Sequence, residues 1–317
     1  MRRRASGTLG VLLLLSACAS AGGTPTTSPS PSGAPSVPPP SSGDGIEHPD
    51  GDEAVLVVSS AGGFVPLEFI ATAMPGFVML GDGRVIVQGA VPAIFPGPAL
   101  PALQTRTLTP VGIQTVLEAV EETGMFTADV ELRGAQGMVA DAADTVFTLN
   151  AGGRQVTITV YALGLVAPGM EPPPGMSSAE IEAHRLLTAL NDALVTIDTS
   201  VPADQWEADG WRPYDAEALR LYVRDATGEP VDEGIPEDVR DWPIPDEDPA
   251  TIGEEVVLFG NGTRCAALDG EVAATWWADL GEASQVTRWT TDGTDRWSVL
   301  VRPLLPYEEV ACPAPAS

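Results

Sequence analysis

Two apolar runs flank a tight-turn signal in the stretch FVMLGDGRVIV, residues 77–87. The pair Asp82-Gly83 between such runs is a strong hairpin signal, because glycine adopts the positive φ that a tight turn requires. A further apolar run, from Val55 to Val58, lies upstream of this stretch. We therefore predict three strands at the start of the folded part, which begins at Ala54.

Downstream of this hairpin the sequence predicts a helix. Thr109 is a good N-cap residue, and Pro110 suits the first helical position. Apolar side chains then recur at helical spacing until Gly124, at Ile113, Val116, Leu117 and Val120. A second hairpin is predicted from residues 145–149 and 156–160, because its second strand alternates apolar and polar residues around a Gly-Gly turn.

A second helix is predicted to run to about Ile197, because Ser177 and Glu180 have the spacing of a capping box. The order of elements over residues 54–199 is therefore β-β-β-α-β-β-α. That order is typical of an antiparallel sheet with helices on one face. We assign residues 54–199 to a first domain.

A second, smaller domain is predicted over residues 211–313. Its expected parts are a strand at 219–223, a long acidic loop at 225–251, a strand at 256–259, a helix at 271–280, and a hairpin of 287–290 with 296–302. The predicted fold class is thus α+β, with two domains that each have a mainly antiparallel sheet and helices on one face.

The first residues of the chain have the features of an export signal. Arg2, Arg3 and Arg4 precede the apolar run from Val11 to Leu15, which is too short to span a bilayer. The four residues Leu15-Ser16-Ala17-Cys18 resemble the lipobox of bacterial lipoproteins. The resemblance implies that signal peptide 1–17 is removed and that Cys18 carries diacylglycerol. The alternative is a plain secretory signal with a cysteine by coincidence.

A lipid on Cys18 would hold the protein at a membrane surface, because two acyl chains give a stable anchor. Residues 18–53 consist mostly of Ser, Thr, Pro, Gly and Ala and then become acidic. Such a segment buries too little apolar surface to fold, so we predict a disordered tether. The expected location is therefore the extracytoplasmic face of the cell membrane.

The charge of the chain excludes several classes of partner and mechanism. It has 16 basic and 44 acidic residues and a formal net charge of -28. A surface of this sign repels phosphate backbones, so we expect no nucleic acid partner. Every basic residue is Arg, which excludes lysine-dependent mechanisms. This usage, rich also in Ala, Gly and Pro, is similar to that of actinobacterial lipoproteins.

The chain has three cysteines. With Cys18 assigned to lipid, Cys265 and Cys312 remain, and an exported protein sits in an oxidising compartment. We therefore predict a disulfide between them. Closing this loop stabilises the fold by roughly 4 kcal/mol in the chain-entropy model.

Catalytic and metal motifs are sparse. His48 lies in an acidic run whose spacing does not match a calcium loop, and His184 follows Glu180 by four residues, which indicates an ordinary helix pair. The sequence contains no nucleophile elbow, zinc motif or phosphate loop. We expect no metal and no cofactor. A hydrolase that uses two carboxylates stays open, because Asp and Glu are abundant.

Two features indicate binding. All the tryptophans fall in the C-terminal third, where exposed indoles could stack on sugars or anchor a protein partner. Trp206, Trp211 and Trp242 lie in loop-like sequence and are the ones expected to be exposed; Trp289 and Trp297 lie in predicted strands and are expected in the core. The apolar loops 91–103 and 167–176 either form a docking patch or complete the core. The candidate binding residues are Trp206, Trp211, Trp242, Trp276, Trp277, Ile94 and Phe95.

The function predicted from these features is a lipid-anchored envelope protein that acts as a non-enzymatic binding or scaffold module. Its expected partners are the membrane, through the lipid, and an envelope protein or glycan. One alternative is a carboxylate-dependent hydrolase acting on envelope glycans. The other is a solute-binding lipoprotein of a transporter, which the hairpins disfavour because such proteins usually have repeated strand-helix-strand units.

Overall fold

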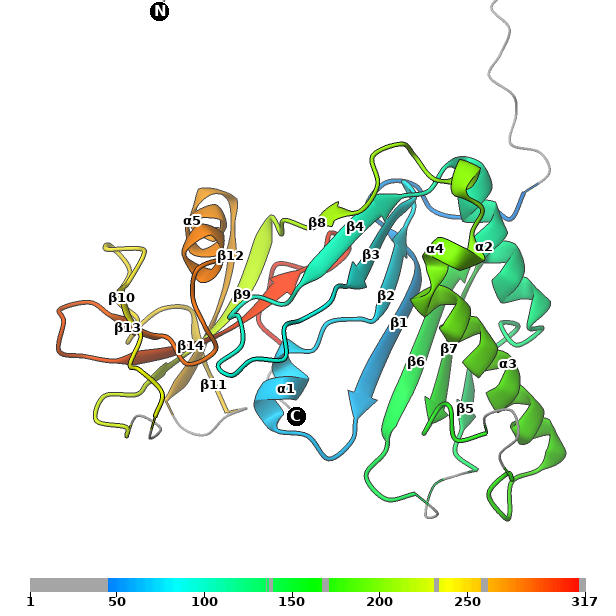
Figure 1. The fold of residues 1–317 in the computed structure, drawn as a ribbon, viewed down its shortest axis with the longest axis horizontal. Coiled ribbons are helices and arrows are strands. Elements are labelled where there is room, and N and C mark those ends of the chain that lie inside the picture. The colour runs from blue at the N-terminus through cyan, green and yellow to red at the C-terminus, as the bar shows by residue number, and fades with distance from the viewer. Residues whose placement is uncertain are drawn as a thin grey trace, which may run out of the picture. The chain divides into compact units, whose positions relative to one another are not determined.

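The computed structural model describes residues 45–134, 136, 139–166, 171–230, 234–257 and 262–313. All of these residues belong to one compact unit, residues 44–317. The expected signal peptide, Cys18 and most of the expected tether lie outside the described residues. In the described part, helices combine with two mainly antiparallel sheets (Figure 1), which confirms the predicted α+β class.

The first sheet has eight strands in the order β5-β7-β6-β1-β2-β3-β4-β8, and only the β5–β7 pair is parallel. Both predicted hairpins are present, as β2–β3 and β6–β7. Gly83 in the first turn has a φ of +86°, so the turn favours glycine. The strands are β1 (Ala54–Gly62), β2 (Phe77–Leu80), β3 (Arg84–Gln88), β4 (Leu103–Thr107), β5 (Val130–Leu132), β6 (Ala143–Ala151), β7 (Arg154–Tyr161) and β8 (Arg212–Pro213).

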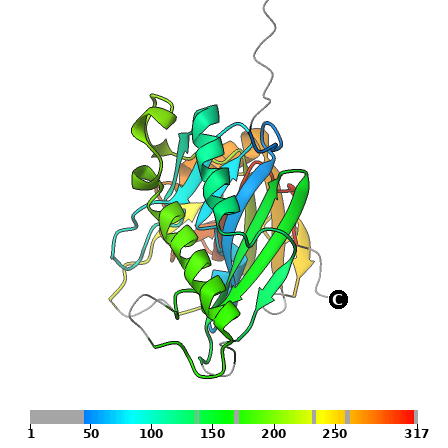
Figure 2. The same cartoon turned by 90° about the vertical axis from the view of Figure 1, so that its right-hand side faces the viewer.

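Two long helices lie on one face of this sheet, α2 (Pro110–Glu122) and α3 (Ser178–Val195), as Figure 2 shows. Both predicted caps are confirmed. The Thr109 side chain accepts a hydrogen bond from the Gly112 amide, and Ser177 forms a capping box with Glu180. After α3 the chain continues through the short α4 (Ile197–Ser200) and the 3-10 helix η1 (Ala203–Gln205).

Among the elements that precede α3, three were not predicted: α1 (Leu67–Thr72), β4 and β5. Strand β5 has only three residues, and α1 buries none of its side chains. In β4 only Leu103 and Thr105 are buried, and one of these is polar. Short elements of this kind carry too few buried apolar residues to produce a periodic signal.

The segment before β1 also differs from the prediction, which places residues 45–53 in the tether. Ile46 exchanges two hydrogen bonds with the side chain of Gln114, at 2.7 and 3.0 Å. The Glu53 carbonyl accepts a hydrogen bond from the Gly81 amide at 2.9 Å. Ordered chain therefore begins before Ala54. The sequence does not reveal this, because a polar segment held by such hydrogen bonds has no apolar periodicity.

The second sheet has six strands in the order β10-β13-β14-β9-β12-β11, with only β10–β13 parallel. Its middle strands β14 and β9, the hairpin β13–β14 and the helix α5 match predicted elements. Strand β12 was not predicted. The elements are β9 (Ala218–Asp225), β10 (Val239–Asp241), β11 (Glu254–Val256), β12 (Thr263–Asp269), α5 (Gly270–Leu280), β13 (Arg288–Thr290) and β14 (Trp297–Leu304).

Two other predictions concern this region. The disulfide between Cys265 and Cys312 is present, with the two Cα atoms 6.0 Å apart. The predicted strand 256–259 overlaps only the end of β11, and residues 258–260 lie outside the described part. The acidic loop 225–251 contains β10, which extends the sheet beside β13.

Alternate residues of β2 serve two hydrophobic cores. Phe77 and Met79 belong to the first core, between the first sheet and helices α2 and α3. Val78 and Leu80 belong to the second, which also contains residues of the second sheet and α5. Both faces of β2 are therefore covered, and all four residues of the strand are buried. The division into two domains stays a prediction, because the second core draws on both sheets.

Candidate functional site

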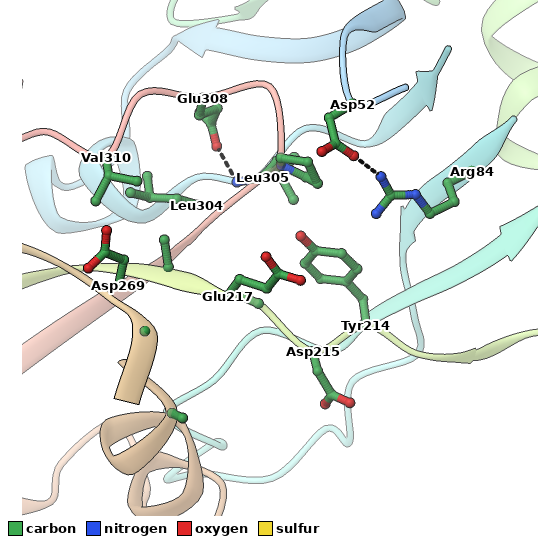
Figure 3. A pocket seen from close by; sticks show the side chains of 15 residues that line it. Asp52, Arg84, Tyr214, Asp215, Glu217, Asp269, Leu304, Leu305, Glu308 and Val310 are labelled. Atoms are coloured by element: carbon green, nitrogen blue, oxygen red, sulfur yellow. Dashed lines mark hydrogen bonds and ion pairs between the residues drawn. The ribbon is translucent and has the colours of Figure 1, made fainter. Parts of the chain in front are cut away.

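A cavity of about 840 Å³ opens at one end of the second sheet, and we call it the junction pocket. There Ala218, at the start of β9, pairs with Asp269 of β12 on one side and with Leu304 of β14 on the other. Three other cavities measure about 390, 150 and 90 Å³. The junction pocket is drawn in Figure 3 and is lined by five carboxylates and one guanidinium, those of Asp52, Asp215, Glu217, Asp269, Glu308 and Arg84.

The first sheet contributes one wall of the junction pocket through Arg84, the first residue of β3. Its guanidinium forms ion pairs with Asp52 and with Asp82, the latter at 2.6 Å between Nε and Oδ2. The amide of Arg84 also donates to the Asp82 carboxylate at 2.9 Å. The predicted hairpin turn thus fixes Arg84, which in turn fixes Asp52 at the rim (Figure 3).

The segment after β14 forms a second wall, and an arginine holds it in place. Both Nη atoms of Arg302 donate to the carboxylate of Glu308, at 2.9 and 2.7 Å. The Leu305 amide donates to the same carboxylate at 2.8 Å. Arg302 is itself buried, and its Nε donates to the carbonyl of Ala73 at 3.2 Å. The charge of Glu308 is therefore compensated, and its role is to position this wall.

Tyr214 lies between β8 and β9, with 8% of its surface exposed. Its amide donates to the Leu103 carbonyl at 3.0 Å, which ties this segment to β4 of the first sheet. In Figure 3 the phenol hydroxyl lies beside the carboxylate of Glu217. Burial raises the pKa of Tyr214 to about 12; the charge of Arg84 opposes this shift, and nearby carboxylates add to it. The phenol therefore stays protonated at neutral pH and can donate a hydrogen bond.

Three carboxylates of the junction pocket have no ion-pair partner among the described residues: Asp215, Glu217 and Asp269. All three are exposed. In Figure 3 Glu217 turns its carboxylate toward the Tyr214 hydroxyl, whereas Asp215 points away from it. Asp269 is the N-cap residue of α5, yet its side chain makes no capping hydrogen bond. The chemistry available here is hydrogen-bond acceptance and negative charge.

Within the described ranges, no group of three or more His, Cys, Asp or Glu side chains is placed to hold a metal ion. None of the described helices has both the length and the apolar character needed to cross a bilayer.

The expectation that Trp206 and Trp242 are exposed is wrong, because each has only 5% of its surface accessible. Trp206 packs in the first core, with the guanidinium of Arg106 4.4 Å from its ring centroid. Trp242 packs in the second core against Trp276, with the ring centroids 4.8 Å apart. Irregular backbone around these indoles resembles exposed loop in the sequence, although the loops fold back onto the sheets.

The remaining tryptophans divide between core and surface. Trp276 and Trp289 are buried, the latter as predicted, and their rings are 4.9 Å apart. Trp277 is half-buried; adjacent residues of a helix point about 100° apart, so Trp276 and Trp277 of α5 are unequally buried. Trp211 is also half-buried and donates from Nε1 to the Asp198 carboxylate at 2.7 Å. Trp297, expected in the core, is half-buried.

Apolar residues are exposed at one of the two predicted loops. Ile94 and Phe95 have 64% and 70% of their surface accessible, whereas Leu103 at the end of the same loop belongs to the second core. Residues 167–170 of the other loop lie outside the described part. The sequence did not indicate a further exposed residue, Phe64, which is 86% accessible and lies just before α1.

The candidate binding residues therefore do not form one site. Trp206, Trp242 and Trp276 are core residues, and none of the seven candidates lines the junction pocket. Its residues were missed because acidic side chains are common throughout the chain, and no spacing marks Glu217 or Asp269. The available signal was Asp269 before Gly270, a possible N-cap ahead of the predicted helix 271–280. Comparisons with protein-family models, with curated proteins and with solved structures found no match.

Proposed function

We propose that the protein is a lipid-anchored envelope protein on the extracytoplasmic face of the cell membrane. In this proposal it acts without catalysis, as a binding or scaffold module, and its ligand site is the junction pocket. The observation that carries the binding part is the cavity of about 840 Å³, which lies within the range of roughly 300 to 1,000 Å³ common for ligand sites.

The location rests on the lipobox resemblance at Leu15-Ser16-Ala17-Cys18. Two further features support export. The disulfide Cys265–Cys312 is of a kind that persists in oxidising compartments. The Ser- and Pro-rich segment after Cys18 has a composition suited to a spacer between a membrane and a folded body.

The walls of the junction pocket favour binding, because ion pairs fix them. Arg84 holds Asp52 on one side and Arg302 holds Glu308 on the other. A preformed site loses less conformational entropy when a ligand binds than a site that must first become ordered. The unpaired carboxylates Glu217 and Asp269 then face a cavity of fixed shape.

The carboxylate-dependent hydrolase is a second candidate, because carboxylates from several segments line one cavity. It requires one carboxyl group to donate a proton while another acts as a base or nucleophile. The experiment that separates the two candidates is incubation of the full chain with envelope glycans. Cleavage by the wild type that is lost in Glu217→Gln or Asp269→Asn would replace the binding proposal with the hydrolase.

The anchor is tested by mass spectrometry of the native protein. We expect an amino terminus at Cys18 with a thioether-linked glyceride, and an unmodified thiol there would contradict the anchor. The binding part is tested by crosslinking the full chain in its own envelope. We expect the wild type and the surface control Glu118→Gln to capture the same molecules, and Glu217→Gln with Asp269→Asn to lose them. Point variants are preferable to a C-terminal truncation, which would expose Val78 and Leu80 of the second core.

A further inference from the structure

We propose that the junction pocket binds an organic cation, an ammonium or guanidinium group carried on an alkyl chain. The inference rests on the proposed binding function and names its ligand class. The juxtaposition that carries it is the unpaired carboxylates of Glu217 and Asp269, the hydroxyl of the largely buried Tyr214 and apolar side chains around one cavity.

The uncompensated charge of the junction pocket is negative. Asp52 and Glu308 are compensated by Arg84 and Arg302, whereas Glu217 and Asp269 have no ion pair among the described residues. A concave site lined by uncompensated charge of one sign concentrates the opposite ion and repels its own sign. The junction pocket therefore selects cations and excludes carboxylate or phosphate ligands.

Tyr214 is the second, independent observation. More than nine-tenths of its surface is buried, and its hydroxyl has no hydrogen-bond partner among the described residues. Tyr214 lines the junction pocket, where its hydroxyl requires water or a ligand as its hydrogen-bond partner. In Figure 3 the hydroxyl lies next to the Glu217 carboxylate, so that an ammonium could donate to both oxygens at once.

The position of Asp269 also favours a cationic ligand. An Asp at an N-cap usually accepts a hydrogen bond from an amide of the first helical turn, and this contact is a common source of helix stability. Asp269 makes no such bond with α5. In Figure 3 its carboxylate is turned toward Val310, across the junction pocket. Both of its oxygens thus remain available as acceptors.

Apolar side chains also line the junction pocket and determine what accompanies the charge. They come from the start of β9, from α5, and from the end of β14 and the segment after it: Ala218, Ala274, Leu304, Leu305, Pro306 and Val310. An alkyl chain can cover this surface while its charged end reaches Glu217, as Lys and Arg side chains do when they cover apolar surface. The fitting ligand is therefore amphiphilic, and it is either a free alkylamine or a Lys or Arg side chain of a peptide.

Calorimetric titration of the full chain in nonionic detergent tests this with three probes that share one alkyl chain: pentylamine, pentanol and pentanoate. We expect pentylamine to bind at least 10-fold more tightly than the other two, and its affinity to fall as salt is added, because added salt screens charges at an open site. Equal affinity for all three probes, no binding of pentylamine, or calcium displacing pentylamine at equal concentration would overturn the proposal.

Variants test whether pentylamine binds in the junction pocket. Glu217→Gln and Asp269→Asn should each weaken pentylamine at least 10-fold, and Tyr214→Phe should weaken it several-fold with an unchanged melting temperature. Glu118→Gln removes the same charge from exposed α2 and should change nothing. An effect of Glu118→Gln equal to that of Glu217→Gln would show a general charge effect and contradict the site.

Two further comparisons distinguish a peptide ligand from a free amine, and failure of the cation proposal from failure of the proposed binding function. A blocked arginine dipeptide that binds more tightly than agmatine indicates a peptide ligand, and the reverse order indicates a free amine. If Glu217→Gln abolishes capture from the envelope while no amine binds, the cation class is wrong and the proposed binding function survives. If neither capture nor amine binding responds to Glu217→Gln, both proposals fail.

Discussion

The two cores of the protein differ in the side chains that fill them. The first is largely aliphatic, and its aromatic rings meet in two separate pairs, Phe126 with Phe147 at 6.3 Å and Trp206 with the half-buried Trp211 at 5.7 Å. The second is centred on Trp242, Trp276 and Trp289, with ring centroids 4.8 and 4.9 Å apart. A core of many small contributions spreads its stability over many residues, whereas a core built on a few large rings depends on each of them.

Replacement of the central ring is expected to have the largest effect. Trp276→Ala removes a fully buried indole that contacts two others, and we expect it to lower the free energy of unfolding by about 3 to 5 kcal/mol. Leu149→Ala in the first core is the comparison, and we expect a smaller loss, toward the lower end of about 2 to 5 kcal/mol. The measurement is urea unfolding of both variants.

The same unfolding curves test whether the cores are independent. Val78 and Leu80 of the first sheet belong to the second core, so we expect Trp276→Ala to shift one cooperative transition. Two separated transitions would contradict this expectation and would support the predicted division at about residues 199–211.

Removal of the disulfide is expected to have the second largest effect on the free energy of unfolding. Its direct effect is on the part of the chain that contains the second sheet. Cys265 and Cys312 are 47 residues apart in the sequence. In the chain-entropy model a loop of this length contributes up to roughly 4 kcal/mol. We expect the double variant Cys265→Ala/Cys312→Ala to lose this amount in urea unfolding. Reductant should destabilise the wild type equally and leave the double variant unchanged; a further loss in the double variant would point to another cause.

The two parts of the molecule also differ in how much of their secondary structure could be predicted from the sequence. Strands β2 and β3 and helices α2 and α3 were predicted because their apolar residues recur at regular spacing beside a turn or a cap. Strand β12 was missed although it pairs with β9 along most of its length. Its sequence, TRCAALD, has only one β-branched residue, Thr263, and no alternation, and its place between β9 and β11 is set by tertiary pairing.

The candidate site was beyond sequence reasoning for a related reason. Tyr214, Asp269 and Glu308 line one cavity although 55 and 39 residues separate them along the chain. The pairing of Ala218 with both Asp269 and Leu304 brings their segments to the same end of the second sheet. Trp242 was placed at the surface because loop-like sequence is usually exposed. Nothing local to that sequence indicates that the ring of Trp276 packs against it.

The smallest expected effect concerns a polar group inside the first core. His184 is fully buried on α3, and neither ring nitrogen has a hydrogen-bond partner among the described residues. The predicted pair with Glu180 is not formed as a hydrogen bond, because that carboxylate accepts from the amide and hydroxyl of Ser177. Burial lowers the pKa of His184, and the charge of Glu180 opposes this shift only in part.

A histidine with a lowered pKa binds its proton less readily in the folded state than in the unfolded state. Its contribution to stability is therefore complete above the unfolded pKa of about 6.5 and is lost as the pH falls toward the folded value, by at most about 1.4 kcal/mol per pH unit. We expect the free energy of unfolding to decline below pH 6.5 in the wild type and in His48→Gln, and to decline less in His184→Leu. His48 is the matched control because the chain has only two histidines. An equal decline in all three proteins would assign the pH dependence to carboxylates and leave the buried imidazole without an energetic role.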